Sequence, residues 1–264
     1  MDLGLQGKIA IVTGGSMGIG KTTALALAYE GAQVAICARG LETLQKAASE
    51  IQSITGSEIL AIRADMTSLD DITWLVSTTV QELGGVDILV NNAVNSVPGT
   101  FLELPDEAWL NHINVKIMGY VRCAREAIPH MIRRGGGRII NIGGMAARNV
   151  GHLTNSNGVT NASVANITKN LSDQVAQHNI LVNCIHPGTT RTPRQTMLLE
   201  RQARDMGVSL PQAEREAVQS IPIGRMVEPE DIADLILFLV SEHAGAITGE
   251  VMAVGGGAGR GIFY

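Results

Sequence analysis

The chain has 264 residues, 45% of them hydrophobic, so it can bury one large core, and it contains no linker, repeat or low-complexity segment. Its net charge of -5 excludes a basic stripe of the kind that binds nucleic acid. The longest apolar runs, such as Ile232 to Val240, are too short to span a bilayer. We therefore predict a single domain, 1–264, whose partners are small molecules or other copies of the chain, with no nucleic acid or membrane among them.

The first residues lack the charged and then apolar pattern of an export signal, which predicts a cytoplasmic protein. The three cysteines, Cys37, Cys123 and Cys184, are scattered through apolar runs without the spacing of metal ligands. We expect them to be buried, reduced thiols, and we expect no metal site.

Short β-branched runs alternate with longer segments of helical period along the chain, a pattern typical of a parallel sheet with crossover helices. The predicted strands are Ile9–Thr13, Gln33–Ala38, Glu58–Ala64, Ile88–Asn91, Arg138–Ile142, Leu181–His186 and Val251–Val254. The predicted helices are Gly20–Glu30, Leu41–Ile54, Leu69–Leu83, Glu107–Arg133, Asn157–Gln177 and Pro229–Ser241. Seven strands make a full doubly wound α/β sheet with helices on both faces. Ser68 and Asp71 resemble a capping box at the start of one of these helices.

The segment Thr189–Val218 differs from the rest because it is long, charged and weakly periodic. It follows the sixth predicted strand, and ligands bind at the carboxyl ends of such strands. We interpret residues 189–218 as a lid over the substrate, and an ordinary surface helical hairpin is the alternative.

A glycine-rich turn follows the first strand directly and opens a helix. Its glycines, Gly14, Gly18 and Gly20, permit a tight turn, a close approach to a pyrophosphate and close packing of helix on strand. The helix start offers unpaired N–H groups to phosphates. We therefore predict a dinucleotide site, in which the intervening residues Ser16, Met17 and Ile19 also contact the cofactor.

The end of the second strand indicates which dinucleotide is bound. Sites that favour NAD place a carboxylate there, whereas this chain has Arg39, which suits a 2′-phosphate. We predict NADP(H) in preference to NAD(H), with a solvated loop arginine as the alternative. After the third strand, Asp65 and the Met66 backbone are candidates for the adenine amino group, and Asp65 could equally cap the next helix.

These residues together resemble the short-chain dehydrogenase/reductase family, and the resemblance covers essentially the whole chain. The glycine turn and Asp65 match the family pattern, and Asn91-Asn92-Ala93 matches its Asn-Asn-Ala-Gly motif with Val94 in the last place. The resemblance implies a Rossmann fold, a proton-relay role for Asn114, and a nicotinamide-binding turn at Pro187, Gly188 and Thr192.

The chain departs from the family pattern at the active-site tetrad. Alignment from the downstream motifs puts the family's tyrosine at Asn157, its lysine at Asn161 and its serine at Gly144, and the thirteen-residue spacing from Gly144 to Asn157 is kept. Asparagine has no titratable proton, and losing a positioned general acid costs about 100- to 10,000-fold in rate. We therefore expect ordinary ketone reduction by the family mechanism to be severely impaired.

Two residues are candidates to replace the lost proton donor: His152, in the loop that lines the family's substrate pocket, and the terminal Tyr264. A solvent-facing loop histidine is the alternative for His152. Asn157 could hold a substrate carbonyl or a water, and Asn161 could bond the nicotinamide ribose. The alternative for both asparagines is a role in capping the helix.

Three functions remain open from the sequence. The first is an NADP(H)-dependent oxidoreductase with a rearranged proton path through Asn114, water and His152, acting on an unknown carbonyl or alcohol. The second is a nucleotide-binding pseudoenzyme that acts as a sensor or assembly partner. The third is a non-redox enzyme, such as a lyase or hydratase, that reuses the pocket. The resemblance also implies a homo-oligomer, either a dimer or a tetramer.

Overall fold

A computed structural model describes residues 2–151 and 154–259 of the chain. Its centre is a seven-stranded sheet in the order β3-β2-β1-β4-β5-β6-β7, in which every neighbouring pair is parallel. The strands are β1 (Ile9–Thr13), β2 (Gln33–Ala38), β3 (Ile59–Arg63), β4 (Ile88–Asn91), β5 (Gly137–Ile142), β6 (Ile180–Pro187) and β7 (Val251–Val254). The chain leaves β1 toward β2 and β3 and then returns to the other side as β4. This reversal creates the crevice in which doubly wound sheets bind ligands.

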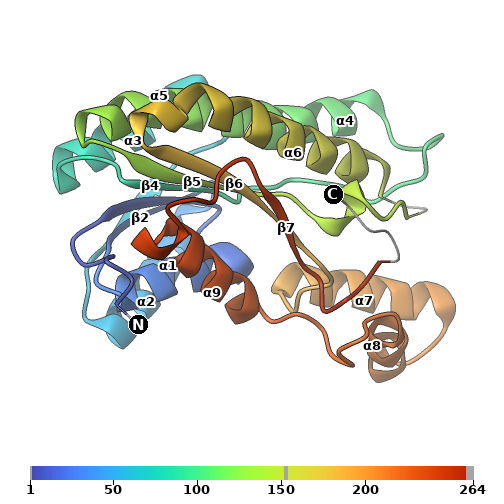
Figure 1. Cartoon of the computed structure of the whole chain (residues 1–264). Coiled ribbons are helices and arrows are strands. Elements are labelled where there is room, and N and C mark those ends of the chain that lie inside the picture. The colour runs from blue at the N-terminus through green and yellow to red at the C-terminus, as the bar shows by residue number, and fades with distance from the viewer. Residues whose placement is uncertain (1, 152–153, 260–264) are drawn as a thin grey trace.

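Helices cover both faces of the sheet (Figure 1). One face holds α1 (Gly18–Tyr29), α2 (Leu41–Thr55) and α9 (Pro229–Val240), and the other holds α3 (Leu69–Leu83), α4 (Asp106–His112), α5 (Gly119–Arg133) and α6 (Asn155–Val175). Successive β1 side chains alternate between the two resulting cores: Ala10 and Val12 pack with α1, α2 and α9, whereas Ile11 packs with α3 and α5. The predicted doubly wound seven-stranded sheet is confirmed.

The helix predicted over Glu107–Arg133 is divided in the structure. A π-helical segment, η1 (Ile113–Met118), lies between α4 and α5. Such segments are rare and occur frequently at functional sites. Helical periodicity in the sequence could not reveal this one, because its residues read as a continuation of the helices on both sides.

The start of α3 shows half of the capping box that the sequence predicts. The Ser68 hydroxyl accepts a hydrogen bond from the Asp71 N–H at 3.1 Å. The carboxylate of Asp71 does not return to the Ser68 backbone; its Oδ2 accepts from the Asp65 N–H at 2.8 Å instead. The cap therefore also fixes the loop in which Asp65 lies.

The segment interpreted as a lid forms two helices, α7 (Pro193–Met206) and α8 (Leu210–Gln219). They pack on each other beyond the end of the sheet (Figure 1), around a small apolar cluster that includes Leu199, Ile221 and Met226. Across residues 2–151 and 154–259, no helix combines the length and apolar character that a membrane crossing requires.

A buried carboxylate joins three elements at the opposite end of the sheet. Asp87, just before β4, accepts from the Ile9 N–H at 2.8 Å and from Arg134 Nε and Nη2 at 2.6 and 2.9 Å. It thus ties β1 and β4 to the end of α5. Charge-assisted bonds of this kind are stronger than neutral ones.

We expect Asp87→Asn to lower the free energy of unfolding by roughly 2 kcal/mol, because it weakens the bonds from Ile9 and Arg134. Urea denaturation would measure the change. The control is Asp173→Asn, which breaks the exposed i,i+4 pair with Lys169 and should change stability by less than about 0.5 kcal/mol. Equal effects of the two substitutions would show that Asp87 has no special role.

Candidate active site

A cleft of about 690 Å³ opens at the carboxyl ends of the central strands. Its walls come from the loops after β1, β2, β3, β4, β5 and β6, from η1 and from the starts of α6 and α7. Of the residues that the sequence assigns to a site, those lining this cleft are Gly14, Ser16, Met17, Gly18, Ile19, Arg39, Asp65, Met66, Asn92, Ala93, Asn157, Asn161, Pro187, Gly188 and Thr192. Residues from six parts of the chain therefore meet at one place.

The glycine-rich turn has the close contacts that exclude larger residues. Gly14 has a φ of +68°, and a Cβ on it would lie 3.0 Å from the Cα of Ala93. A Cβ on Gly20 would lie 2.3 Å from the Gly14 carbonyl oxygen. Gly20 is not among the residues lining the cleft, so its part is to let α1 pack closely on the turn.

Asn92 and Thr13 hold this turn against the loop after β4. The Thr13 hydroxyl accepts from the N–H groups of Asn92 and Ala93 at 2.9 and 3.1 Å. In return, the Asn92 side chain donates to the carbonyl oxygens of Thr13 and Gly14 at 3.0 and 3.2 Å. The glycine-rich turn is thus fixed by hydrogen bonds within the protein.

One end of the cleft is basic. Arg39 is exposed at the end of β2, and its carbonyl oxygen accepts from Arg63 Nε at 3.1 Å, which brings a second guanidinium to this end. Asp65 also lines the cleft, while its Oδ1 accepts from the Thr67 N–H at 2.8 Å and the Thr67 hydroxyl at 2.9 Å. Burial raises the pKa of Cys37 to about 12, so this thiol stays protonated.

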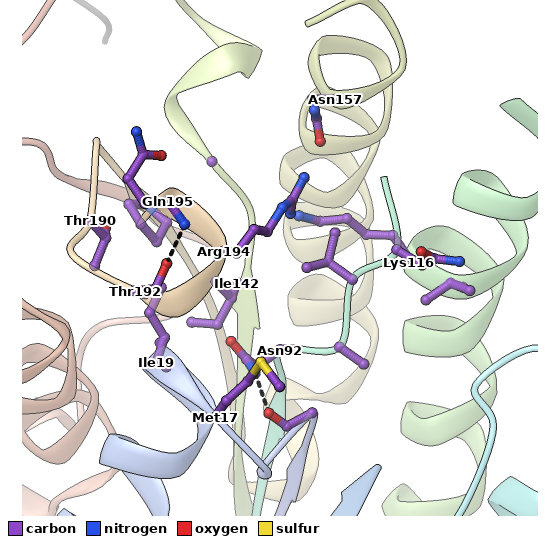
Figure 2. Close-up of a pocket in the computed structure, with 18 of the residues that line it drawn as sticks. Met17, Ile19, Asn92, Lys116, Ile142, Asn157, Thr190, Thr192, Arg194 and Gln195 are labelled. Atoms are coloured by element: carbon purple, nitrogen blue, oxygen red, sulfur yellow. Dashed lines mark hydrogen bonds between the residues drawn. The ribbon is translucent and has the colours of Figure 1, made fainter. Parts of the chain in front are cut away.

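The two asparagines of α6 face the cleft from successive turns of the helix. Asn157 is half-buried and lies above the middle of the cleft (Figure 2). Because α6 begins at Asn155 with Thr154 as its N-cap, neither Asn157 nor Asn161 caps the helix. The capping alternative is therefore wrong for both residues.

Asn161 is 4% exposed, and its Oδ1 has no hydrogen-bond partner among the described residues. A buried, unsatisfied amide oxygen costs about 1 to 3 kcal/mol, so it marks a place where a donor is missing. A ribose hydroxyl entering the cleft would supply that donor. The donor set and the tight glycine turn therefore fit a dinucleotide.

Gly144 lies against the same amide. A Cβ at this position would approach Asn161 Nδ2 to 2.6 Å, so a serine at position 144 would force the Asn161 side chain to move. The Gly144 N–H donates to His186 Nδ1 at 3.0 Å, and burial lowers the pKa of His186 to about 4. His186 therefore stays neutral and accepts this bond.

The structure does not bring Asn114 into the cleft. Its Oδ1 accepts from Arg122 Nη1 at 2.8 Å, and its carbonyl oxygen accepts from the Gly119 N–H in the π-helical turn. Two residues later, Lys116 lines the cleft instead. His152 and Tyr264 lie outside the described residues.

Lys116 is the cation that the sequence interpretation missed. It is only 4% exposed, and its Nζ donates to the Gly143 carbonyl oxygen at 2.9 Å. Burial is the main cause that lowers its pKa to about 7, and the nearby Arg194 guanidinium contributes to the same shift. No carboxylate pairs with Lys116 in the described parts of the chain.

Neutral groups hold the surroundings of Lys116 in place. His112 bridges α4 and α6 through Ser156 Oγ at 3.1 Å, and burial lowers the pKa of His112 to about 4. The Tyr120 hydroxyl donates to the Ile142 carbonyl oxygen at 3.0 Å, and burial raises its pKa. Tyr120 is thus a structural phenol that stays protonated.

A second missed cation enters from the other side of the cleft. Arg194 lies in the first turn of α7, two residues after Thr192, whose hydroxyl caps this helix by accepting from the Gln195 N–H at 3.2 Å. Figure 2 shows the side chains of Arg194 and Lys116 extending toward each other below Asn157. In residues 2–151 and 154–259 no cluster of side chains could hold a metal ion.

Comparison with known proteins agrees with this geometry. Residues 14–259 match the family model described as enoyl-(acyl carrier protein) reductase. The chain is 32% identical over 254 residues to the 3-oxoacyl-(acyl-carrier-protein) reductase of Thermotoga maritima, covering 96% of this chain and 98% of that protein.

Solved structures show the same likeness. L-sorbose reductase from Gluconobacter frateurii, in complex with NADPH and L-sorbose, superposes with a TM-score of 0.93 at 34% identity, covering 97% of this chain and 98% of that one. NAD+-bound xylitol dehydrogenase gives 0.90 at 25% identity, covering 96% and 99%. The chain belongs to the short-chain dehydrogenase/reductase family.

Proposed function

We propose that the chain is an NADP(H)-dependent carbonyl reductase in which Lys116 delivers the proton that the family takes from tyrosine. The observation behind this proposal is a buried ammonium group that lines the cofactor cleft and has a pKa of about 7. A general acid is most effective when its pKa lies near the working pH. The cofactor, when bound, supplies the hydride.

The positions of three small or neutral residues support this substitution. By the spacing of the motifs we align Gly144, Asn157 and Asn161 with the serine, tyrosine and lysine of the family pattern, and all three line the cleft that Lys116 enters. None of them can donate a proton, because glycine has no side chain and amides do not titrate. We infer that the missing acid has been replaced from η1.

The preference for NADP(H) rests on charge. Arg39 and Arg63 meet at the end of β2, and neither forms an ion pair with the described residues. Guanidinium groups bind phosphate in a two-pronged geometry. The NADPH in the sorbose reductase supports this choice, although the xylitol dehydrogenase holds NAD+, so family membership alone does not decide it.

The residues would act in order as follows. The unsatisfied Oδ1 of Asn161 would accept a hydrogen bond from a ribose hydroxyl, and this bond would orient the cofactor. Asn157 donates to the substrate carbonyl oxygen from above. Lys116 Nζ then transfers its proton to that oxygen as the carbonyl carbon takes the hydride. The neutral amine regains a proton from solvent, so each turnover consumes one hydride and one proton.

The helices α7 and α8 act in this proposal as the cover of the substrate. Four residues of α7, namely Pro193, Arg194, Gln195 and Leu198, line the cleft. A helical hairpin with only a surface role would not contribute side chains there.

A nucleotide-binding pseudoenzyme is the second candidate, and one observation favours it. The glycine-rich turn and the unpaired Oδ1 of Asn161 fit a dinucleotide. By contrast, Gly144, Asn157 and Asn161, which we align with the family's proton-transfer residues, have no titratable group. This candidate expects tight NADPH binding without turnover. A sensitive assay of NADPH oxidation against a panel of carbonyl compounds separates the two functions.

We expect Arg39→Ala to weaken NADPH binding about tenfold and to leave NADH binding unchanged, because only NADPH has the 2′-phosphate. Titration of cofactor fluorescence would measure both affinities. Lys46→Ala, an exposed change on the neighbouring α2, is the control for general charge effects. Equal losses for the two cofactors would contradict the assignment of Arg39.

We expect Lys116→Met to lower kcat for carbonyl reduction by about 100- to 10,000-fold while NADPH binding is retained. In the unchanged protein, kcat/KM should fall as pH rises through about 7, because the pKa of Lys116 in the free protein is lowered and the ammonium form is lost there.

The variant should lose this pH dependence together with its rate. Lys169→Met on the exposed face of α6 is the matched control. A Lys116→Met protein with full activity and an unchanged pH profile would exclude Lys116 as the proton donor.

A further inference from the structure

We propose that the substrate is an oxo acid whose carboxylate binds Arg194 beside Lys116, an inference that rests on the reductase function proposed above. The cleft joins two cations that reach it from opposite walls, η1 and α7. Neither cation has an anionic partner in the described parts of the chain.

Arg194 is placed to bind a ligand. It is half-buried, and its Nη2 donates to the Ser96 carbonyl oxygen at 3.4 Å and to the Ser96 hydroxyl. Its Nε and Nη1 form no hydrogen bond with the described residues. Ser96 therefore holds one side of the guanidinium, and the remaining N–H groups match the two oxygens of a carboxylate.

The charge in this part of the cleft is unbalanced. Among the described residues that line the cleft, Asp65 is the only acidic one, and it lies after β3, at the end where Arg39 and Arg63 meet. The groups around Lys116 are His112 from α4, Tyr120 from α5, Cys184 and His186 from β6, and Arg194 from α7. None of these groups is an anion at neutral pH. The negative charge of a bound carboxylate would offset the positive charges of Lys116 and Arg194.

The pKa values agree with this picture. Burial lowers the pKa of Arg194. Burial also lowers the pKa of His112, and the charges of Lys116 and Arg194 contribute to that shift. The charge of Arg194 disfavours the ammonium form of Lys116. An anion between them would reverse this effect and raise the pKa of Lys116.

The cofactor phosphates do not account for Arg194. They belong over the glycine-rich turn at the start of α1, and Arg194 points away from Met17 and Ile19 toward Lys116 (Figure 2). The cation is thus on the side of the cleft where Asn157 and Lys116 would meet a carbonyl group.

Binding of the carboxylate would also prepare the proton transfer. At pH 8 most Lys116 is neutral because its pKa is about 7. A carboxylate on Arg194 favours the ammonium form, so Lys116 takes a proton from solvent as the substrate binds. Reduction then moves that proton to the carbonyl oxygen, and the hydride comes from the cofactor. The product is a hydroxy acid.

The first experiment compares each of pyruvate, acetoacetate and levulinate with its methyl ester as substrates of the NADPH-bound protein. We expect at least one acid to have a kcat/KM about tenfold or more above that of its ester. Arg194→Met should remove this advantage, with a loss of about 10- to 100-fold for the acid that the ester does not share. Arg201→Met, an exposed change on the same helix, should affect neither.

The second experiment measures binding without turnover. Calorimetry of the preferred acid with the NADP+-bound protein at pH 8, in two buffers of different ionisation enthalpy, should show uptake of close to one proton per acid bound. Lys116→Met should bind the acid without this uptake. A merely structural Lys116 would not change the proton count.

The outcomes separate this inference from the proposed function. Equal turnover of acids and esters would overturn the oxo-acid assignment and leave the reductase intact. Acid binding without turnover of any carbonyl would overturn the reductase and leave the anion site. If Arg194→Met weakens NADPH binding and lowers the turnover of acids and of esters by the same factor, Arg194 binds the cofactor and the inference is wrong.

Discussion

The burial of Lys116 without a counter-ion shapes the chemistry of the cleft. Moving an ammonium group out of water is costly, and proteins usually pair such a group with a carboxylate. Among the described residues, the one hydrogen-bond partner of Lys116 Nζ is the Gly143 carbonyl oxygen, so the protein tolerates a partly neutral lysine. Burial also keeps His112 and His186 neutral, so that they act as fixed hydrogen-bond partners. Dry surroundings thus set the protonation states in this part of the protein, and the charge of Lys116 adds to their effect on both histidines.

This arrangement offers a different solution to a problem that the family solves with a tyrosine. A phenol has an ordinary pKa of about 10 and must be lowered by a neighbouring cation to act near neutrality. A lysine has a similar ordinary pKa, and burial alone lowers it. The pKa values of the two acids reach the same range through different surroundings. The tyrosine needs a positively charged neighbour, whereas the lysine needs burial away from water. The proposed role of Lys116 also suits an uncharged Asn161, since a second buried ammonium group in the cleft would repel Lys116.

Most of the fold could be predicted from the sequence. The β-branched runs predicted both ends of β1, β2, β4 and β7 correctly. Such runs are informative because parallel strands are buried on both faces and are bounded by turn residues. The glycine-rich turn and Asn92 could also be predicted from the sequence, because their roles are local and depend on backbone conformation. The predicted ends of α1, α2, α4, α6, α9, β3, β5 and β6 differ from those in the structure by one or two residues.

The candidate site was harder to predict, because its cations become functional only through distant contacts. Lys116 has the appearance of a solvated helix residue, and nothing local reveals that η1 turns it toward Gly143. Arg194 lies in a charged segment in which several other arginines are exposed, and only the contact with Ser96, 98 positions away, distinguishes it. Asn114 was expected in the cleft from a resemblance, yet its side chain contacts Arg122, which is eight residues further along the same run of helix.

The contact between positions 144 and 161 couples the two residues. A Cβ at Gly144 would approach Asn161 Nδ2 to 2.6 Å, so a larger residue at position 144 requires the Asn161 side chain to take another rotamer. That rotation would also carry the unsatisfied Oδ1 of Asn161 away from its present place. Substitutions at the two positions therefore share one side chain, and their effects on cofactor binding should not be additive.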